Sequence, residues 1–132
     1  MEGIMLSNKE AIATIGVRDV EAARKFYGNV LGLQEDSSAG DKCEGVVCYL
    51  SGKSRIFVYE SKYAGTNQAT VVTWDVGAEI GEIVAALKAK GASFEHYEME
   101  GMRLEGDIHV GDQMKVVWLK DPDGNILSIN GK

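Results

Sequence analysis

The sequence predicts an α+β fold built from two similar modules, each with the order strand, helix, three strands (βαβββ). A β-branched strand followed by a helical apolar stripe and a terminating glycine occurs twice. The copies are evenly spaced, because Val17 and Val76, and likewise Gly32 and Gly91, are 59 positions apart (76 − 17 and 91 − 32). Strand patterns follow each helix. Since one such module is too small to bury its own helix face well, the two must share a sheet or pack together.

The composition indicates one ordered domain. The chain has 132 residues, a size at which a single domain buries enough surface to fold without a disulfide or a metal. Hydrophobic residues make up 45% and charged residues 26%, values typical of globular rather than disordered proteins. We therefore expect one domain over residues 1–132, with the first module at about 9–62 and the second at about 69–132.

Charge and hydropathy argue against two classes of partner. The net charge of −6 comes from interspersed acidic and basic residues, whereas a nucleic-acid surface needs clustered Lys and Arg. Apolar runs such as Gly45 to Leu50 are too short to cross a bilayer, and residues 1–4 lack the basic-then-apolar pattern of a signal peptide. We expect no nucleic-acid or membrane partner, a cytoplasmic location, and two reduced cysteines, with Cys48 in the core and Cys43 exposed.

The first module begins with a strand over Ala11 to Val17 and a helix. Asp19 stands where an N-cap accepts backbone donors, and apolar residues then recur at helical spacing. Gly32 ends this helix, because its missing Cβ suits a left-handed C-terminal position. The hairpin that follows is expected to have strands at residues 45–50 and 55–60 and a turn at residues 51–54.

The second module repeats this order. Val71 to Val76 is a β-branched and aromatic strand, a helical apolar stripe begins at Ile80, and Gly91 ends it. The Asp-Pro-Asp-Gly-Asn sequence at residues 121–125 predicts a tight turn before the last strand. Further strands are expected at 93–98, 115–119 and 126–130, and long polar loops near the mouth of a pocket at 61–70 and 100–113.

Two stretches resemble a known family. Residues 15–33, IGVRDVEAARKFYGNVLGL, are similar to the opening of the vicinal-oxygen-chelate superfamily, which includes glyoxalase I, extradiol dioxygenases and bleomycin-binding proteins. Residues 118–129, WLKDPDGNILSI, are similar to its DPDGN ending. The resemblance covers nearly the whole chain. It implies a cupped mixed sheet with helices on the outer face, and it implies a homodimer.

Superfamily members with a metal use four ligand positions, and the resemblance places these positions on Ile12, Phe57, Val71 and Ser128. The first three side chains offer no lone pair to a cation, and Ser128 offers a neutral hydroxyl. A divalent site needs three or four nitrogen, oxygen or sulfur ligands. We therefore expect no metal and no cofactor, which puts glyoxalase, dioxygenase and metal-dependent transferase activity in doubt.

Aromatic side chains suggest a small-molecule pocket instead. Phe57, Tyr59 and Trp118, with Tyr49 as a further candidate, could line the cupped sheet and stack on a planar ligand. Ordinary core packing is the competing explanation. Strand alternation adds polar groups to the same face. The predicted ligand-binding set is Ile12, Thr14, Phe57, Tyr59, Val71, Thr73, Trp118 and Ser128.

These observations favour a metal-independent protein that sequesters a partly planar organic molecule. Two other classes stay open. One is a glyoxalase-like lyase or isomerase, or a dioxygenase-like enzyme. It would use His109, placed in the polar loop, or Asp75 as a metal-free acid or base, or a relocated metal site around His96 or His109. A structural, hydrogen-bonded histidine is the competing explanation. The other class is a structural or regulatory dimer.

Overall fold

The structure is a computed structural model that describes residues 6–36 and 46–132. Cys43 and Gly45, named above, lie outside the described residues. After a short 3₁₀ turn at Leu6–Asn8, the first module runs through β1 (Ala13–Val17), α1 (Val20–Ala23), a π-helical continuation (Arg24–Val30), β2 (Gln34–Glu35), β3 (Val46–Ser51) and β4 (Ser54–Glu60). The second module comprises β5 (Thr70–Gly77), α2 (Ile80–Ala89), β6 (Phe94–Glu95), β7 (Arg103–Glu105), β8 (Ile108–Val110), β9 (Lys115–Lys120) and β10 (Ile126–Gly131).

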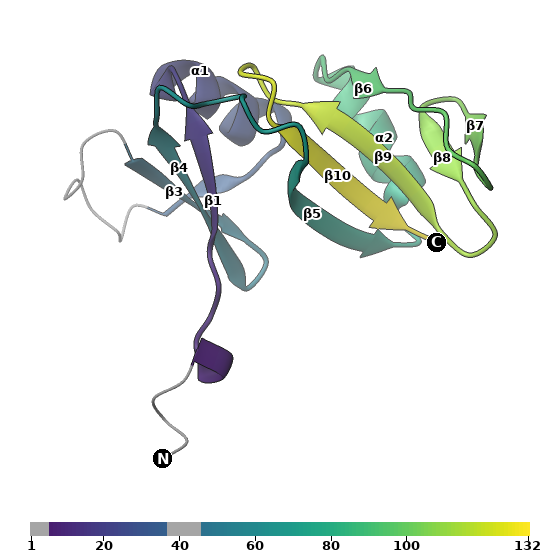
Figure 1. Ribbon diagram of the computed structural model, residues 1–132, viewed down its shortest axis with the longest axis horizontal. Helices are drawn as coiled ribbons and strands as arrows, with labels where there is room; N and C mark the ends of the chain where they lie inside the picture. Colours follow the sequence, from purple (N-terminus) through teal and green to yellow (C-terminus); the bar gives the residue numbers. More distant parts are fainter. Residues whose placement is uncertain (1–5, 37–45) are drawn as a thin grey trace.

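Each module forms its own mixed sheet, and the two sheets lie beside one another (Figure 1). The strand order is β1-β4-β3-β2 in the first sheet and β5-β10-β9-β8-β7 in the second, with β6 pairing β9. In each sheet the first strand of the module pairs in parallel with the strand at the module's end, β1 with β4 and β5 with β10. The predicted α+β class with two repeated modules is confirmed.

The predicted helix boundaries are also found. The Asp19 side chain caps α1 by accepting hydrogen bonds from the backbone N–H groups of Glu21 and Ala22. Gly32 and Gly91 have φ values of +76° and +97°, the left-handed region in which a Cβ is strained. Both helices therefore begin and end where the sequence indicates.

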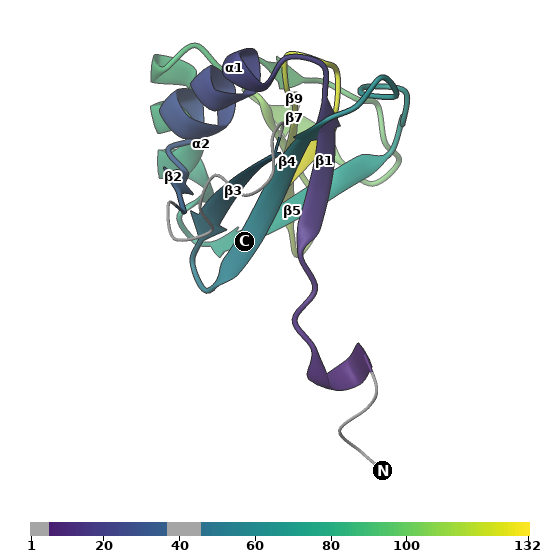
Figure 2. The same cartoon turned by 90° about the vertical axis from the view of Figure 1, so that its left-hand side faces the viewer.

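Both helices lie on the same side of the two sheets, and the core fills the space between (Figure 2). Ile15, Val17, Ile56 and Val58 are buried at 0–2% exposure, so alternate residues of β1 and β4 face the helices. One core cluster joins these residues to those of α2 and β10 in the second module. The opposite, helix-free side of the two sheets is called the open face below.

The Asp-Pro-Asp-Gly-Asn turn joins the second module to the first. The buried Asp121 carboxylate accepts a 2.7 Å hydrogen bond from the Tyr27 hydroxyl, and burial together with this carboxylate raises the pKa of Tyr27. The Asn125 amide donates to the Gly16 carbonyl over 2.8 Å, and the Arg18 N–H donates to Asp123 over 3.1 Å. The two stretches that carry the family resemblance are therefore in direct contact.

Three expectations about local structure are wrong. Residues 100–113 are not one long loop, because β7 and β8 form an antiparallel hairpin within them. The strand expected at 93–98 is confined to Phe94–Glu95. Tyr49 does not line the open face: it pairs in register with Ile56, faces the helices and is 2% exposed. In the described part of the chain, no helix has the length and apolar character needed to cross a membrane.

Candidate ligand pocket on the second module

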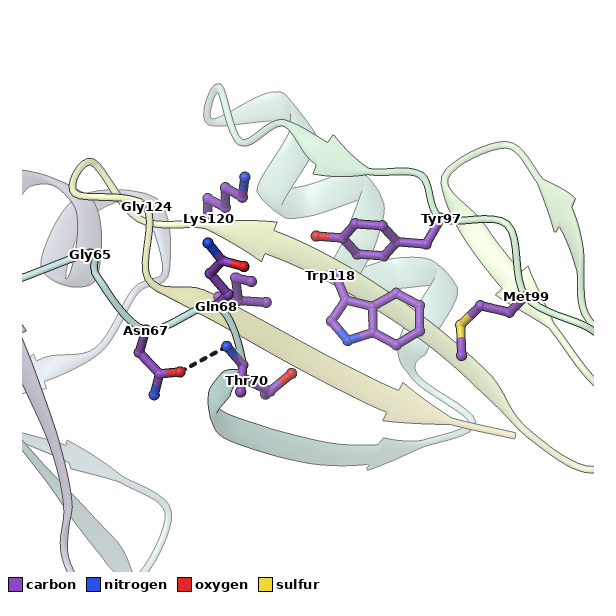
Figure 3. A pocket seen from close by; sticks show the side chains of 11 residues that line it. Gly65, Asn67, Gln68, Thr70, Tyr97, Met99, Trp118, Lys120 and Gly124 are labelled. Carbon is purple, nitrogen blue, oxygen red and sulfur yellow. Dashed lines mark hydrogen bonds between the residues drawn. The ribbon is translucent and has the colours of Figure 1, made fainter.

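A pocket of about 720 Å³ lies on the open face of the second module (Figure 3). Its volume is within the usual range for small-molecule sites. The segment that links the two modules forms one wall, the chain after β6 forms another, and β9 and β10 form the floor. The lining residues are Gly65, Asn67, Gln68, Ala69, Thr70, Tyr97, Met99, Trp118, Lys120, Gly124 and Ile126.

Strand register places the floor of the pocket. Val117 and Leu119 are fully buried in the core at 0% and 1% exposure, so alternation directs Trp118 and Lys120 to the open face. Lys120 pairs with Ile126, which lies opposite Thr70 of β5. This row across three strands is the part of the floor nearest to the linking segment.

Gly65 holds the linking wall against the turn at residues 121–125. Its φ is +73°, and a Cβ built there would lie 1.9 Å from the Asp123 carbonyl oxygen. Only glycine allows this approach in that conformation. Asn67 then closes a local turn by accepting the Ala69 N–H over 2.8 Å (Figure 3).

The other wall is aromatic. The Tyr97 ring lies 5.3 Å from the Trp118 ring at an interplanar angle of 70°, and the His109 ring lies 4.8 Å from Trp118 at 78°. Met99 lies at the same end of the pocket (Figure 3). These edge-to-face contacts are the arrangement that aromatic quadrupoles favour.

His109 supports this wall from below. It lies in β8 and is 1% exposed, so its expected place in a loop is wrong. Its Nε2 faces the Tyr97 N–H at 2.9 Å, and its Nδ1 faces the Val116 carbonyl at 3.3 Å. An N–H can only donate and a carbonyl can only accept, so Nε2 accepts from Tyr97 and Nδ1 donates to Val116. Both ring nitrogens are engaged, and proton transfer to a ligand would first break one of these bonds.

His96 and Asp75, the other titratable candidates, lie outside the pocket lining. His96 contacts Asp107 through Nε2 at 2.8 Å, and Lys88 contacts the same carboxylate at 2.8 Å. Hydrogen bonds from Lys88 and then His96 lower the pKa of Asp107. Asp75 is exposed and accepts the Gly77 N–H over 3.3 Å.

Most of the predicted ligand-binding residues share the open face without lining the pocket. Thr14 pairs with Phe57, Gly16 pairs with Tyr59, and all four are opposite to the buried residues of their strands. Ile12 precedes β1 and is 38% exposed. Of the eight predicted residues, all within the described ranges, Trp118 alone lines this pocket.

The second module holds the remaining predicted residues. The Thr73 and Ser128 hydroxyls share a 2.6 Å hydrogen bond, so a protein neighbour satisfies each of them. Val71 falls in a register shift, because Ile126 pairs with Thr70 whereas the next residue of β10 pairs with Val72. Val71 is half-buried and packs against the core.

Sequence reasoning missed Tyr97, Met99, Gln68 and Lys120. Alternation along β9 was a usable signal for Lys120, since it lies two residues after Trp118 on the same face. The other three come from irregular segments, where no periodicity reports side-chain direction.

The four expected metal positions do not fit a metal. Ile12, Phe57 and Val71 carry hydrocarbon side chains, and the Ser128 hydroxyl is bonded to Thr73. Across residues 6–36 and 46–132, the structure brings together no group of three or more His, Cys, Asp or Glu side chains that could hold a metal ion.

Two βαβββ modules side by side, with helices on one face and a pocket on the other, define the class of fold. The chain belongs to the Glyoxalase/Bleomycin resistance protein/Dioxygenase superfamily, whose family model matches residues 11–129. The resemblance found in the sequence is thereby confirmed. Comparison with curated protein sequences gives no significant match.

Several solved structures share the fold. A glyoxalase/dioxygenase from Nostoc punctiforme aligns with a TM-score of 0.70 at 16% identity, covering 100% of this chain and 98% of that one. An integron cassette protein from the mobile metagenome of the Halifax Harbour sewage outfall gives 0.67 at 20% identity, covering 92% and 96%. The fosfomycin resistance protein FosX from Listeria monocytogenes gives 0.64 at 16% identity, covering 97% and 93%. At these identities the likeness shows the fold alone.

Proposed function

We propose that this chain is a small-molecule binding protein that holds a partly planar organic compound in the pocket of its second module without a metal. The observation that carries the proposal is the pair of aromatic rings, Tyr97 and Trp118, at one end of a pocket of about 720 Å³. Aromatic walls with a few polar groups are the usual makeup of sites for planar ligands.

The rings are available to a ligand. Tyr97 is 36% exposed and Trp118 is half-buried, so both present surface to the pocket while their positions are fixed by contacts with His109. A ring that stacks on Trp118 would bury apolar area from both partners, which is worth roughly 25 cal/mol per Å² before the costs of association. Pre-positioned rings lower those costs because little side-chain freedom is lost on binding.

The chemistry of the expected ligand positions supports binding without a metal. Three of the four positions carry side chains that cannot coordinate, and the fourth is already hydrogen-bonded within the protein. A ligand held by a chelated ion would need donors that these positions do not offer. Stacking and hydrogen bonding in the pocket of the second module need no metal ion.

Calorimetric titration with a neutral bicyclic probe, 2-naphthalenemethanol, tests the proposal. The protein is first treated with a chelator and its metal content measured. We expect saturable binding at one site in the metal-stripped protein, and a loss of at least about fivefold in affinity in Trp118→Ala and in Tyr97→Ala, since stacking contacts of this kind contribute about 1–3 kcal/mol each.

Trp74→Phe is the matched control. Trp74 lies on the core side of β5 and donates to Ser51 over 2.8 Å, so this change removes an indole without touching the pocket. Binding that appears only after Zn, Mn, Ni or Fe(II) is added would overturn the metal-free part of the proposal. Equal affinity in the wild type, Trp118→Ala and Tyr97→Ala would overturn the assignment of the pocket.

A further inference from the structure

The pocket is lined by one basic side chain, although the chain as a whole carries a net charge of −6. Among the described residues that line it, Lys120 is the one with a charge, and no lining residue is a carboxylate. Lys120 lies two positions after Trp118 on the same face of β9. The strand repeat therefore sets the two side chains roughly 7 Å apart at their base, about the span of a bicyclic ring system.

Several polar groups of the pocket can donate hydrogen bonds to a ligand. The Trp118 indole N–H can only donate, whereas the Gln68 amide and the Tyr97 hydroxyl can both donate and accept. The Asn67 oxygen already accepts the Ala69 N–H, which leaves its NH₂ group. Donors around a cation match a ligand that is rich in acceptors.

The apolar and the polar side chains lie at opposite ends of the pocket. Tyr97, Trp118 and Met99 lie together at one end of the pocket, and Lys120 and Gln68 lie at the other, with the Tyr97 hydroxyl pointing toward that second end (Figure 3). A ligand that fits both ends has a flat apolar body and an anionic group on its edge.

We infer that the pocket selects planar aromatic anions, specifically aromatic carboxylates, with the ring against Trp118 and Tyr97 and the carboxylate on the Lys120 ammonium. This inference rests on the function proposed above and adds the charge of the ligand to it. In a partly desolvated site, a hydrogen bond between a carboxylate and an ammonium is stronger than a hydrogen bond between neutral groups.

Glu95 sets the strength of this selection. It pairs in register with Trp118, and its carboxylate lies 3.5 Å from the Lys120 nitrogen, outside the lining of the pocket. Both side chains are partly exposed, so their ion pair is weak. Glu95 holds the Lys120 ammonium at the edge of the pocket, and it competes with a bound ligand carboxylate for that ammonium. Removing the negative charge of Glu95 should therefore improve binding of anions.

Three probes with one ring system and different charges test the inference: 2-naphthoate, 2-naphthalenemethanol and 2-naphthylmethylammonium, titrated by calorimetry at pH 7.5 in low salt. We expect wild-type affinity to be highest for the naphthoate, about tenfold lower for the alcohol, and lowest for the ammonium. Raising the ionic strength should weaken naphthoate binding and leave the alcohol unchanged.

Three variants test whether Lys120 causes the preference for the naphthoate. Lys120→Met should lower the ratio of naphthoate to alcohol affinity about tenfold, Lys120→Arg should retain most of that ratio, and Glu95→Gln should raise it severalfold. Lys53→Met, in the exposed turn between β3 and β4 of the first module, is the control that removes one positive charge elsewhere.

The outcomes separate the two proposals. If the alcohol binds as tightly as the naphthoate, or if Lys120→Met leaves the ratio of naphthoate to alcohol affinity unchanged, the charge selection is overturned while the binding function stands. If none of the three probes binds to the wild type, the binding function fails, and the inference that rests on it fails as well.

Discussion

At the scale of single residues, Asp121 and Tyr27 show how the chain uses a buried polar pair. The Asp121 carboxylate is 5% exposed and accepts hydrogen bonds from the Tyr27 hydroxyl, the backbone N–H groups of Asp123 and Asn125, and the Asn125 amide. A buried charge of this kind is stable because each donor offsets part of its desolvation. The same carboxylate therefore shapes the turn and fixes the first helix.

Tyr27→Phe should lower the free energy of unfolding by about 1–3 kcal/mol, because the change removes a donor from a buried carboxylate and leaves the ring in place. Urea denaturation followed by circular dichroism measures this. Tyr63→Phe, at a tyrosine that is 69% exposed, should change stability by less than about 0.5 kcal/mol. Equal effects in the two variants would contradict the role given to the Tyr27 hydroxyl.

Gly65 and Gly52 form a second matched pair. Both have positive φ, +73° and +56°, but a Cβ at Gly65 would strike the Asp123 carbonyl whereas one at Gly52 would meet nothing within 4 Å. Gly52→Ala should cost about 1–2 kcal/mol of unfolding free energy, the ordinary penalty of a left-handed residue. Gly65→Ala should cost clearly more and weaken binding of 2-naphthalenemethanol, since the wall of the pocket must move. Unchanged binding in Gly65→Ala would argue against this wall.

At the scale of elements, Asp107 ties the β7–β8 hairpin to α2 and to the segment after β6. Its carboxylate lies 2.8 Å from Lys88 of α2 and 2.8 Å from His96. These partners lower the pKa of Asp107 below its ordinary value of 3.8. The ionised carboxylate is therefore favoured in the folded state, and its protonation weakens the attachment of the hairpin.

The lowered pKa of Asp107 predicts how the free energy of unfolding depends on pH. A lowered folded-state pKa contributes stability that is fully present above the unfolded-state value, near 3.8, and is lost as the pH falls through the folded-state value. Unfolding free energies between about pH 6 and 2 should thus fall more steeply in the wild type than in Asp107→Asn. Asp112→Asn, at an exposed position between β8 and β9, is the control. Parallel curves for the wild type and Asp107→Asn would contradict the assignment.

The elements that the sequence predicted well are those with a period. Ile15 and Val17 alternate with less buried positions, and Asp19 and Gly32 bound the helix, because local backbone chemistry decides each of these features. The β7–β8 hairpin was missed because exposed, charged residues around glycines look the same in a loop and in an edge strand. Tyr49 was placed on the wrong face because its direction depends on its partner strand.

The candidate site was predictable only in part, for a related reason. Trp118 follows from strand alternation, whereas Tyr97 reaches it through a ring contact between segments about 20 positions apart in the chain. The register shift at Val71 could not be foreseen, since a bulge leaves no mark in a run of β-branched residues. Side-chain direction in irregular segments is set by tertiary contacts alone.

At the scale of the whole molecule, side-chain bonds and one core join the modules. The Trp74 indole of the second module donates to Ser51 of the first over 2.8 Å, and the core cluster includes residues of both sheets. The open face of the first module carries exposed apolar side chains, with Tyr59 at 38% and Val46 at 39%. Such a surface is suited to contact with another chain.

Homodimerisation stays a prediction at this scale. We expect size-exclusion chromatography with light scattering to give twice the chain mass at micromolar concentration, because burial of the apolar open face of the first module would favour association. Tyr59→Lys, which places a charge on that face, should shift the equilibrium toward the monomer. A monomeric wild type at these concentrations would overturn the expectation.

The segment at residues 61–69 is both the covalent connection between β4 and β5 and a wall of the pocket. Two halves expressed as separate polypeptides, divided inside this segment, would keep the contacts of the shared core and could reassociate into a folded particle. Such a particle would have a free end at the ligand site. The same stretch of backbone thus serves both as the covalent link between the modules and as a wall of the proposed ligand site.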